Sequence, residues 1–332
     1  MCCLFGILDY QGRLSLARRR QMLAVLAREC EARGTDAAGI AYCVNHHMSV
    51  YKAPKPAHLV NFQPPAQAHF IMGHTRMATQ GDEHCNYNNH PFKGGAGNTT
   101  FALAHNGVIH NDQLLKVQYQ LPKTKIETDS YVAVQLLEKM GKLDFRSLRK
   151  MAEVMQGTFT FMVLDDRNNL YIVKGNNPMC IYHFPREGFY IYASTKEILD
   201  QAATKLHLNR RHRKEIPLKQ REILKITPDG SRHVEQFQND YLLQSSFNLY
   251  GWGGHYPYYP TYPTYPMHPS VTPDEEQPSY LEELMEFGES IGVMREDQQL
   301  LLDAGYTWMD LEEMFYDPML LDVCLRDAAC PV

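Results

Sequence analysis

The chain opens with the stretch MCCLFG (residues 1–6), which places two of its eight cysteines at the very start. Three explanations are open: the cysteines carry lipid anchors, they begin an ordinary buried strand, or one of them is a nucleophile that has to stand first. Position 2 lacks the glycine that myristoylation requires, and no polybasic segment lies nearby, so lipid anchoring is disfavoured. The motifs further along the chain decide between the other two.

Cys2 follows a methionine, and cysteine is small enough for removal of that methionine to be expected. The mature chain would then begin with a cysteine that carries a free α-amino group beside its thiol. An α-amine has a reference pKa of about 8, so it can act as a base without a histidine nearby in the sequence. This self-contained arrangement explains why such a nucleophile would come first.

The composition is that of a globular protein outside the membrane. The chain has 332 residues, 44% of them apolar and 21% charged, which is enough for one large domain or two ordinary ones. No apolar run approaches the roughly 20 residues of a membrane helix, and the start lacks a secretory signal. The cysteines show no CxxC spacing, so neither a disulfide framework nor a zinc ribbon is expected. The sequence therefore predicts a cytoplasmic protein without membrane contact.

Charge is segregated along the chain. From Ser270 to the end there are 16 acidic and two basic residues, whereas the remainder has 31 basic and 22 acidic residues. A Tyr/Pro/Gly-rich run without helical or strand periodicity separates the two regions. We therefore predict a folded domain over residues 2–240, a disordered linker over residues 241–278 and an acidic helical tail over residues 279–332.

The sequence of residues 2–240 predicts a mixture of strands and helices. Strand-like runs cover residues 4–8, 39–44, 70–73, 101–104, 158–164, 170–173, 179–184, 189–193 and 222–226. Helical periodicity covers residues 14–33, 128–141, 145–155 and 195–206. Thr128 and Thr195 are expected to be the N-caps of the second and last of these helices. Hairpin-like strand pairs beside separate helices favour an α+β arrangement with antiparallel sheets.

The acidic tail has apolar residues at helical spacing. Three or four short amphipathic helices are expected between Ser279 and Ala329, with Gly305 as a C-cap and Thr307 as the next N-cap. They would form a small bundle or fold only on a partner. The basic stretch over residues 210–214 is short and is interpreted as a solvated loop, so nucleic acid is not expected as a partner.

Five further motifs follow the opening in order: RGTDAAG (33–39), GHTRMATQG (73–81), NNHPF (88–92), AHNGVIHN (104–111) and ETDS (127–130). Together with the opening C-x-L-F-G, this set resembles the class II glutamine amidotransferase domain, an N-terminal-nucleophile (Ntn) hydrolase. The resemblance runs from Cys2 to about Ile226. It implies a four-layer αββα sandwich of two antiparallel sheets flanked by helices.

The resemblance also implies an enzyme and assigns its catalytic groups. Cys2 would attack the side-chain amide of glutamine, giving a tetrahedral intermediate and then a γ-glutamyl thioester and ammonia. Its own amine would serve as the proton shuttle. The side-chain amide of Asn106 and the backbone N–H of Gly107 would form the oxyanion hole. Arg76 would bind the α-carboxylate of glutamine, and Asp129 would pair with its α-ammonium group.

Met77, Thr79 and His90 are further substrate-pocket positions by this resemblance. Three residues depart from the family pattern: Cys3 stands where glycine is usual, Met77 replaces an aromatic residue, and Ala37 stands where a serine is common. No cofactor or metal is expected, because the clustered histidines and a cysteine match no zinc spacing. That cluster comprises His74, His84, His90, His105, His110 and Cys85.

Taken without the resemblance, three of these motifs have simpler interpretations. Asn106-Gly107 is a common hairpin-turn dipeptide, Arg76 could be a surface residue, and Asp129 could supply charge at a helix start. Three functions remain open at the level of the whole chain. The domain could release ammonia for a separate acceptor synthase, act as a plain glutaminase or other amide hydrolase, or be a glutamine-binding scaffold that works through its acidic tail.

The first of these functions is favoured. The residues after the domain are too few for a second catalytic domain and contain no phosphate-binding glycine loop, so the ammonia acceptor is predicted to be a separate polypeptide. Glutamine is then the substrate, and the sequence leaves the oligomeric state open.

Overall fold

The computed structural model describes residues 2–242 and parts of the C-terminal region. The described C-terminal residues are 285–286, 288–289, 293–304, 311, 314–315, 321, 324–325 and 328. The chain divides into two compact units, Met1–Gly253 and Gly254–Val332. Among the described residues, no helix is long and apolar enough to cross a membrane. Most of the expected linker, together with Gly305 and Thr307, lies outside the described residues.

One of the two sheets in the first unit has seven strands. They are β1 (Cys3–Leu8), β2 (Ala37–Val44), β3 (His47–Ala53), β4 (Phe70–Arg76), β9 (Cys180–Phe184), β10 (Phe189–Ala193) and β11 (Lys214–Glu215). The strand order is β11-β9-β10-β1-β4-β2-β3, and every pairing is antiparallel. The strand that follows Cys2 therefore lies at the centre of this sheet, between β10 and β4.

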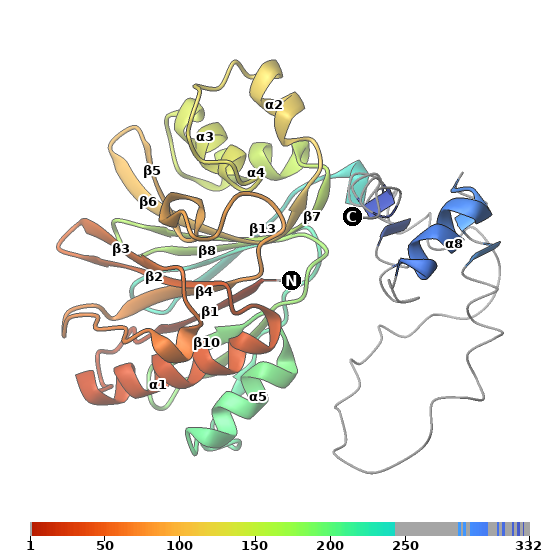
Figure 1. The fold of residues 1–332 in the computed structure, drawn as a ribbon. Helices are drawn as coiled ribbons and strands as arrows, with labels where there is room; N and C mark the ends of the chain where they lie inside the picture. Colours follow the sequence, from red (N-terminus) through yellow and green to blue (C-terminus); the bar gives the residue numbers. More distant parts are fainter. Residues whose placement is uncertain are drawn as a thin grey trace, which may run out of the picture. The chain divides into compact units, whose positions relative to one another are not determined.

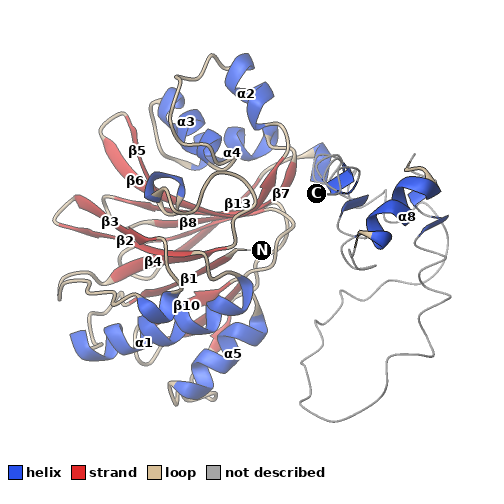
Figure 2. Ribbon diagram, viewed as in Figure 1, coloured by secondary structure: helices blue, strands red, loops and turns tan. Residues whose placement is uncertain are grey.

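The other sheet has six strands. They are β5 (Phe92–Ala96), β6 (Thr99–Ile109), β7 (Gly157–Asp165), β8 (Leu170–Lys174), β12 (Glu222–Ile226) and β13 (Arg232–Gln236). Their order is β13-β12-β8-β7-β6-β5, again antiparallel throughout. The two sheets lie between two layers of helices (Figure 1, Figure 2).

Helices cover the outer face of each sheet. The seven-stranded sheet packs against α1 (Leu16–Glu29) and α5 (Lys196–Lys205), and the six-stranded sheet lies against the layer formed by α2 (Asp112–Gln118), α3 (Tyr131–Met140) and α4 (Phe145–Val154). Short 3₁₀ helices connect some of these elements: η1 (Cys30–Arg33), η2 (Ala57–Leu59) and η3 (Asn86–Asn88). This four-layer αββα sandwich confirms the predicted fold.

Side-chain alternation along β1 shows how the layers are built. Leu4 and Leu8 belong to the apolar cluster between the sheets, whereas Phe5 and Ile7 belong to the cluster under α1 and α5. Both faces of this strand are therefore buried, which explains its continuous apolar sequence. Cys2 has the same parity as Leu4, so the alternation directs its side chain to the space between the sheets.

The helix boundaries agree with the prediction for α5 but not for α3. Thr195 is the N-cap of α5, and its hydroxyl accepts a hydrogen bond from the backbone N–H of Ile198. The prediction for α3 is wrong, because this helix begins at Tyr131 with Ser130 at the N-cap position. The Ser130 hydroxyl and N–H both donate to the carboxylate of Asp129. The hydroxyl of Ser130 is therefore used by Asp129 and does not cap the helix.

The second unit contains helix α8 (Arg295–Asp303) among its described residues. The Gln298 side chain is buried and donates to the carbonyls of Met285 and Val293 at 3.1 and 2.9 Å. Leu301 is fully buried in a small apolar cluster made by Val293, Leu301, Leu311, Met314, Phe315 and Cys324. The bundle interpretation of the whole tail remains a prediction.

Candidate active site

Cys2 lies immediately before β1 and is partly exposed. Its thiol sulfur is 3.5 Å from the backbone carbonyl oxygen of Met77, and its own carbonyl accepts a hydrogen bond from Nε of Arg33 at 3.0 Å. Burial raises the pKa of the Cys2 thiol; the positive charge of Arg76 opposes this shift, and the charge of Asp129 adds to it. Since the thiolate is the nucleophilic form, this cysteine needs a base to act at neutral pH.

Cys3 points to the other side of the sheet. Its side chain is fully buried in the cluster under α1 and α5, and its sulfur is 2.9 Å from that of Cys30. The side chain that replaces the glycine usual at this position is therefore directed away from the face that carries Cys2.

Asn106 and Gly107 lie inside β6, opposite Thr160 and Phe159 of β7, so the hairpin-turn interpretation is wrong. Gly107 has a φ of +141°, and a Cβ at this position would lie 1.9 Å from the carbonyl oxygen of Thr158. The Asn106 carbonyl accepts a hydrogen bond from Nδ2 of Asn177 at 2.7 Å. Because a trans peptide points its C=O and N–H in opposite directions, the Gly107 N–H is directed away from Asn177.

The Asn106 side chain is fully buried between the sheets. Its Nδ2 donates to the hydroxyl of Ser194 at 3.4 Å, and its Oδ1 has no hydrogen-bond partner among the described residues. One Nδ2–H is therefore used by Ser194, and the second remains available to a ligand.

Arg76 is the last residue of β4 and only 3% exposed, so the surface interpretation is wrong. Its guanidinium donates to Asn89 Oδ1 at 2.7 Å and to the carbonyls of Gln80 and Gly81 at 2.6 and 2.8 Å. Burial lowers the pKa of Arg76, and the charges of Cys2, Asp129 and two other acidic side chains counteract this shift. The same cation thus holds the loop that follows β4, and its charge opposes the rise in the pKa of Cys2.

Asp129 connects the start of α3 to the end of β6. Its Oδ2 accepts from the backbone N–H of Ile109 at 2.5 Å, and its Oδ1 accepts from the N–H and hydroxyl of Ser130 at 2.7 and 3.1 Å. The carboxylate is buried and acts on the pKa values of both Cys2 and Arg76. Asp129 therefore does more than supply charge at a helix start: it bonds the end of β6, and its charge acts on Cys2 and Arg76.

The RGTDAAG motif supports the loop after β4. The Asp36 carboxylate accepts from the N–H of Ala78 at 2.7 Å, and the Asp36 N–H donates to the carbonyl of Arg76 at 3.0 Å. A Cβ on Gly34 would lie 2.5–2.6 Å from the backbone of Arg76 and Met77, so only glycine permits this approach. The motif acts as structural support for the site.

Met77 and Thr79 lie in this loop with exposed side chains; that of Met77 is 51% exposed. The contact that Met77 makes with Cys2 is through its backbone carbonyl. Replacement of the family's aromatic residue thus leaves this backbone contact in place.

His90 is buried beside two other aromatic rings. Its ring centroid lies 4.3 Å from that of His74 and 4.4 Å from that of Phe92, and both ring nitrogens lack partners among the described residues. Burial lowers the pKa of His90 well below its usual value, and burial lowers the pKa of His74 to about 3. His74 Nε2 contacts the carbonyl of His105 at 2.9 Å, so this neutral imidazole connects β4 to β6.

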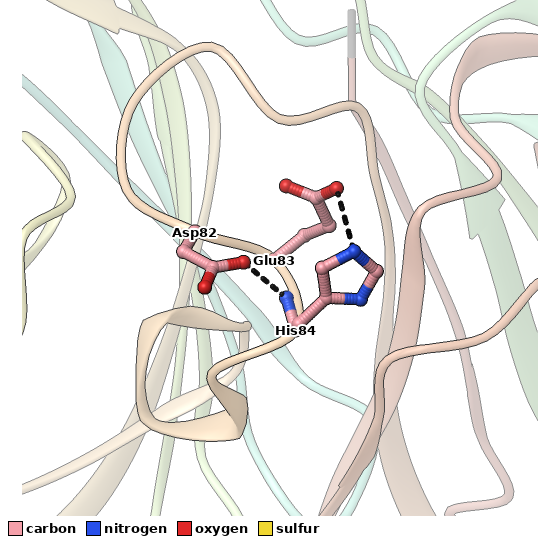
Figure 3. Close-up of side chains that lie close together, drawn as sticks. All are labelled: Asp82, Glu83 and His84. Atoms are coloured by element: carbon pink, nitrogen blue, oxygen red, sulfur yellow. Dashed lines mark hydrogen bonds and ion pairs between the residues drawn. The ribbon is translucent and has the colours of Figure 1, made fainter.

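Asp82, Glu83 and His84 bring ligand-type atoms together on the same loop (Figure 3). These atoms lie within 4.8 Å of one another, with His84 Nε2 3.6 Å from Glu83 Oε1. The His84 N–H also donates to Asp82 Oδ1 at 2.8 Å. Exposed acidic groups of this kind are common without an ion, and no other feature of the described residues indicates that these three side chains bind a metal.

Two further residues of the site, Asn177 and Ser194, were not found from the sequence. Asn177 follows β8 in a turn, and Ser194 follows β10 just before the N-cap of α5. Neither lies in one of the recognised motifs, and no local sequence signal marks them.

Comparison with known proteins identifies the family. Residues 64–239 match the glutamine amidotransferase domain family. The chain is 31% identical over 207 residues to glutamine–fructose-6-phosphate aminotransferase [isomerizing] of Staphylococcus aureus, a match that covers 58% of this chain and 32% of the relative. It is 30% identical over 246 residues to the Staphylococcus epidermidis protein of the same name, covering 71% and 38%. The chain therefore spans about a third of the length of these relatives.

Solved structures share the fold. Glutamine phosphoribosylpyrophosphate amidotransferase from B. subtilis, in complex with ADP and GMP, matches with a TM-score of 0.56 and 20% identity, over 71% of this chain and 49% of that one. A structure described as the allosteric regulatory enzyme of purine biosynthesis matches with a TM-score of 0.57, with the same identity and coverage. The domain match, the relatives and the fold together lead to one conclusion: the chain belongs to the class II glutamine amidotransferase domain family, a family of enzymes.

Proposed function

We propose that the domain hydrolyses the side-chain amide of glutamine through a thioester on Cys2, and that the ammonia is used by an acceptor enzyme on another polypeptide. The observation that carries this proposal is the grouping of Cys2 with two charged side chains that act on its pKa, Arg76 and Asp129, beside the Asn106–Gly107 pair of β6. Each of these groups matches a different part of the glutamine molecule or of its transition state.

Binding of glutamine would use the two charged side chains. The Arg76 guanidinium has the fork geometry that suits the α-carboxylate, and the Asp129 carboxylate suits the α-ammonium group. Both side chains are at most 4% exposed, so their interactions with a charged ligand are weakly screened. Holding both charges of the amino-acid end leaves the side-chain amide free to reach Cys2.

The reaction would then proceed in two steps. The Cys2 sulfur attacks the amide carbon, and its proton passes through the Cys2 α-amine, freed by removal of Met1, to the departing nitrogen, which leaves as ammonia. The Asn106 Nδ2–H and the Gly107 N–H stabilise the negative oxygen of the tetrahedral intermediate. Water next attacks the thioester carbon, glutamate leaves, and the thiol regains its proton.

The α-amine is a suitable base because the thiol does not ionise readily. Burial raises the pKa of Cys2, so few molecules carry the thiolate at neutral pH without a proton acceptor. A base attached to the same residue supplies this acceptor at a fixed distance. This part of the proposal requires that Met1 be removed, which a mass measurement checks directly.

The acceptor is proposed to be a separate enzyme. The relatives are named as fructose-6-phosphate aminotransferases, and the match covers only 32–38% of their length. In this chain the second unit is Gly254–Val332, with a small apolar cluster of its own. We propose the domain division 2–240, 241–278 and 279–332, with the linker tethering the acidic tail as a docking element for the acceptor.

Intact-protein mass tests the nucleophile. Protein with a native N-terminus is measured with and without an electrophilic glutamine analogue, and so are the variants Cys2→Ala and Cys3→Ala. We expect loss of Met1 and one adduct that is present in wild type and Cys3→Ala, absent in Cys2→Ala, and suppressed by excess glutamine. Cys3 is the matched control because it is the neighbouring thiol but faces the opposite side of the sheet. Retained Met1, or an adduct that persists in Cys2→Ala, would contradict the proposal.

Ammonia release tests the substrate. Wild type is expected to release ammonia from glutamine in a Cys2-dependent manner and to act more slowly on asparagine, whose side chain is one methylene shorter. Equal or faster release from asparagine would instead indicate a different amide substrate.

A further inference from the structure

A buried hydroxyl connects the strand of the nucleophile to the side chain of Asn106. Ser194 is fully buried at the end of β10. Its Oγ accepts a hydrogen bond from the backbone N–H of Leu4 at 2.8 Å and a second from Nδ2 of Asn106 at 3.4 Å. Leu4 is two residues after Cys2, so one oxygen contacts both the segment that carries the nucleophile and the side chain proposed to stabilise the oxyanion.

This contact joins the two sheets. Leu4 belongs to β1 of the seven-stranded sheet, and Asn106 belongs to β6 of the six-stranded sheet. Backbone ladders fix the spacing of strands within a sheet, but the spacing between sheets is set by side-chain packing. Between these sheets the packing is largely apolar, and the bond from His74 to His105 is a neighbouring polar bridge to the same strand. β6 is thus held to the other sheet at two consecutive residues.

The bond to Ser194 also sets which way the Asn106 amide points. The amide carries donors on Nδ2 and acceptors on Oδ1, and rotation of the amide plane exchanges them. With one Nδ2–H on Ser194, the other is available to the oxyanion. In the exchanged orientation Oδ1 would face the developing negative charge and oppose the reaction. A hydroxyl can donate as well as accept, but here the Ser194 oxygen accepts from Nδ2, so the structure holds the orientation that the chemistry needs.

We propose that Ser194 is a positioning residue of the glutaminase reaction: it sets the orientation of the Asn106 amide and its distance from the Cys2 thiol. This inference rests on the proposed function, because it assigns Ser194 a role through Asn106. Ser194 does not contact the groups that would hold the amino-acid end of glutamine, Arg76 and Asp129, in any described hydrogen bond. The residue should consequently influence turnover more than substrate binding.

The first test compares Ser194→Ala with Thr75→Val. Thr75 is the matched control, because its fully buried hydroxyl in the same sheet bonds a backbone carbonyl, that of Cys30, at 3.0 Å. Misplacing a catalytic group by about 1 Å can lower the rate roughly 10²-fold, so kcat of Ser194→Ala should fall about 10- to 100-fold. KM for glutamine should stay within about twofold of wild type, and Thr75→Val should keep both constants near wild type.

Sites are counted with the electrophilic glutamine analogue, so that misfolded protein is not mistaken for slow enzyme. Alkylation of Cys2 by iodoacetamide needs no oxyanion hole and should proceed in Ser194→Ala at close to the wild-type rate. Ser194→Thr keeps the oxygen and should turn over faster than Ser194→Ala. A wild-type kcat in Ser194→Ala, or a threonine variant no better than alanine, would overturn the inference.

A double-variant cycle tests whether Ser194 acts through Asn106. In an Asn106→Ala variant the amide that Ser194 would orient is absent. Adding Ser194→Ala to that variant should therefore lower kcat by less than about twofold. If the two losses multiply instead, Ser194 acts independently of Asn106 and the inference is wrong. A wild-type enzyme that shows no Cys2-dependent glutamine hydrolysis would overturn the proposed function as well, which distinguishes that failure from the failure of the inference alone.

Discussion

The backbone at Gly107 leaves no room for a side chain. Its φ of +141° is a region that other residues rarely adopt, and a Cβ would lie 1.9 Å from the Thr158 carbonyl oxygen and 2.7 Å from Asn177 Nδ2. We expect Gly107→Ala to lose about 1–3 kcal/mol of unfolding free energy from backbone strain alone. Turnover should fall about 10²-fold or more, because the shifted peptide no longer aims its N–H at the oxyanion. Denaturant unfolding and steady-state kinetics measure the two effects.

Gly95→Ala is the matched control for this substitution. Gly95 lies in β5, the neighbour of β6, and a Cβ there would meet no atom within 4 Å. It should change stability by less than about 0.5 kcal/mol and leave turnover unchanged. If Gly107→Ala behaved like Gly95→Ala, the assignment of a closely packed oxyanion strand would be wrong.

Asp36 supports a second residue-level prediction. Its carboxylate holds the N–H of Ala78, and so anchors the loop whose carbonyls bind Arg76. A hydrogen bond to a charged group is worth about 1.5–3 kcal/mol, so Asp36→Ala should raise KM for glutamine about tenfold, with a smaller change in kcat. Asp82→Ala is the control, because that carboxylate contacts neighbours in its own loop. Equal KM values for the two variants would contradict this role for Asp36.

The candidate site residues that the sequence suggests lie in contiguous motifs. Cys2, Arg76, Asn106 and Asp129 each stand in a short stretch, and the order of these stretches resembles a known family; their catalytic roles stay predictions. Ser194 could not be found in this way, because it approaches Asn106 only when β10 pairs with β1 and the two sheets stack. Asn177 could not be found from the sequence for the same reason, because its amide contacts Asn106 from the segment after β8. Contacts made by tertiary packing leave no local trace in the chain.

At the level of elements, the strands missed by the sequence are those that lack an apolar pattern. β13 reads RHVEQ and is mostly exposed, β3 reads HMSVYKA with its side chains largely exposed or half-buried, β5 reads FKGGA with two glycines, and β11 has only two residues, both exposed. All four are edge strands. Edge strands are often short and carry charged or small residues in place of an apolar run, so their sequences give little strand signal. The central strands, buried on both faces, were predicted from their apolar runs.

The strands β4, β5 and β6 meet at a group of buried neutral imidazoles, which predicts sensitivity to acid. Burial lowers the pKa of His74 to about 3, and burial also lowers the pKa values of His90 and His105. In the unfolded chain a histidine titrates near pH 6.5, so protons bind the unfolded state first. The stability that His74 contributes is therefore present above about pH 6.5 and is lost as the pH falls toward 3.

The variant His74→Gln tests this linkage, because glutamine keeps an amide donor for the His105 carbonyl but does not titrate. Between about pH 6 and pH 4 the unfolding free energy of wild type should decline more steeply than that of the variant, by about 1.4 kcal/mol per pH unit. Urea unfolding at several pH values measures both slopes. Parallel slopes would show that His74 is not held neutral in the folded protein.

At the scale of the folded domain, the four layers bring two of the proposed catalytic residues, Cys2 and Asn106, to facing sheets. Cys2 precedes the central strand of one sheet, and Asn106 lies in the other, so the site exists only when both sheets are stacked. This explains how motifs spread over the first 130 residues of the chain could contribute to one proposed site. It also predicts that any loss of sheet packing near Ser194 reduces turnover before it unfolds the domain.

The end of the first unit fixes where the chain can be shortened. Asn239 Nδ2 donates to the carbonyls of Ala152 and Met155 at 2.7 and 2.9 Å, and Phe237 and Leu242 are buried in the cluster under α4. A chain ending at Asn248 keeps these contacts, and we expect its kcat/KM to stay within about twofold and its Tm within about 2 °C of the full chain. A chain ending at Gln236 loses two large buried apolar side chains, each worth about 1.5–3 kcal/mol, and should melt much lower. Thermal unfolding and glutamine hydrolysis compare the three chains. A loss of stability on truncation at Asn248 would show that residues after 248 stabilise the first unit, and would contradict a tail that acts only as a tethered docking element.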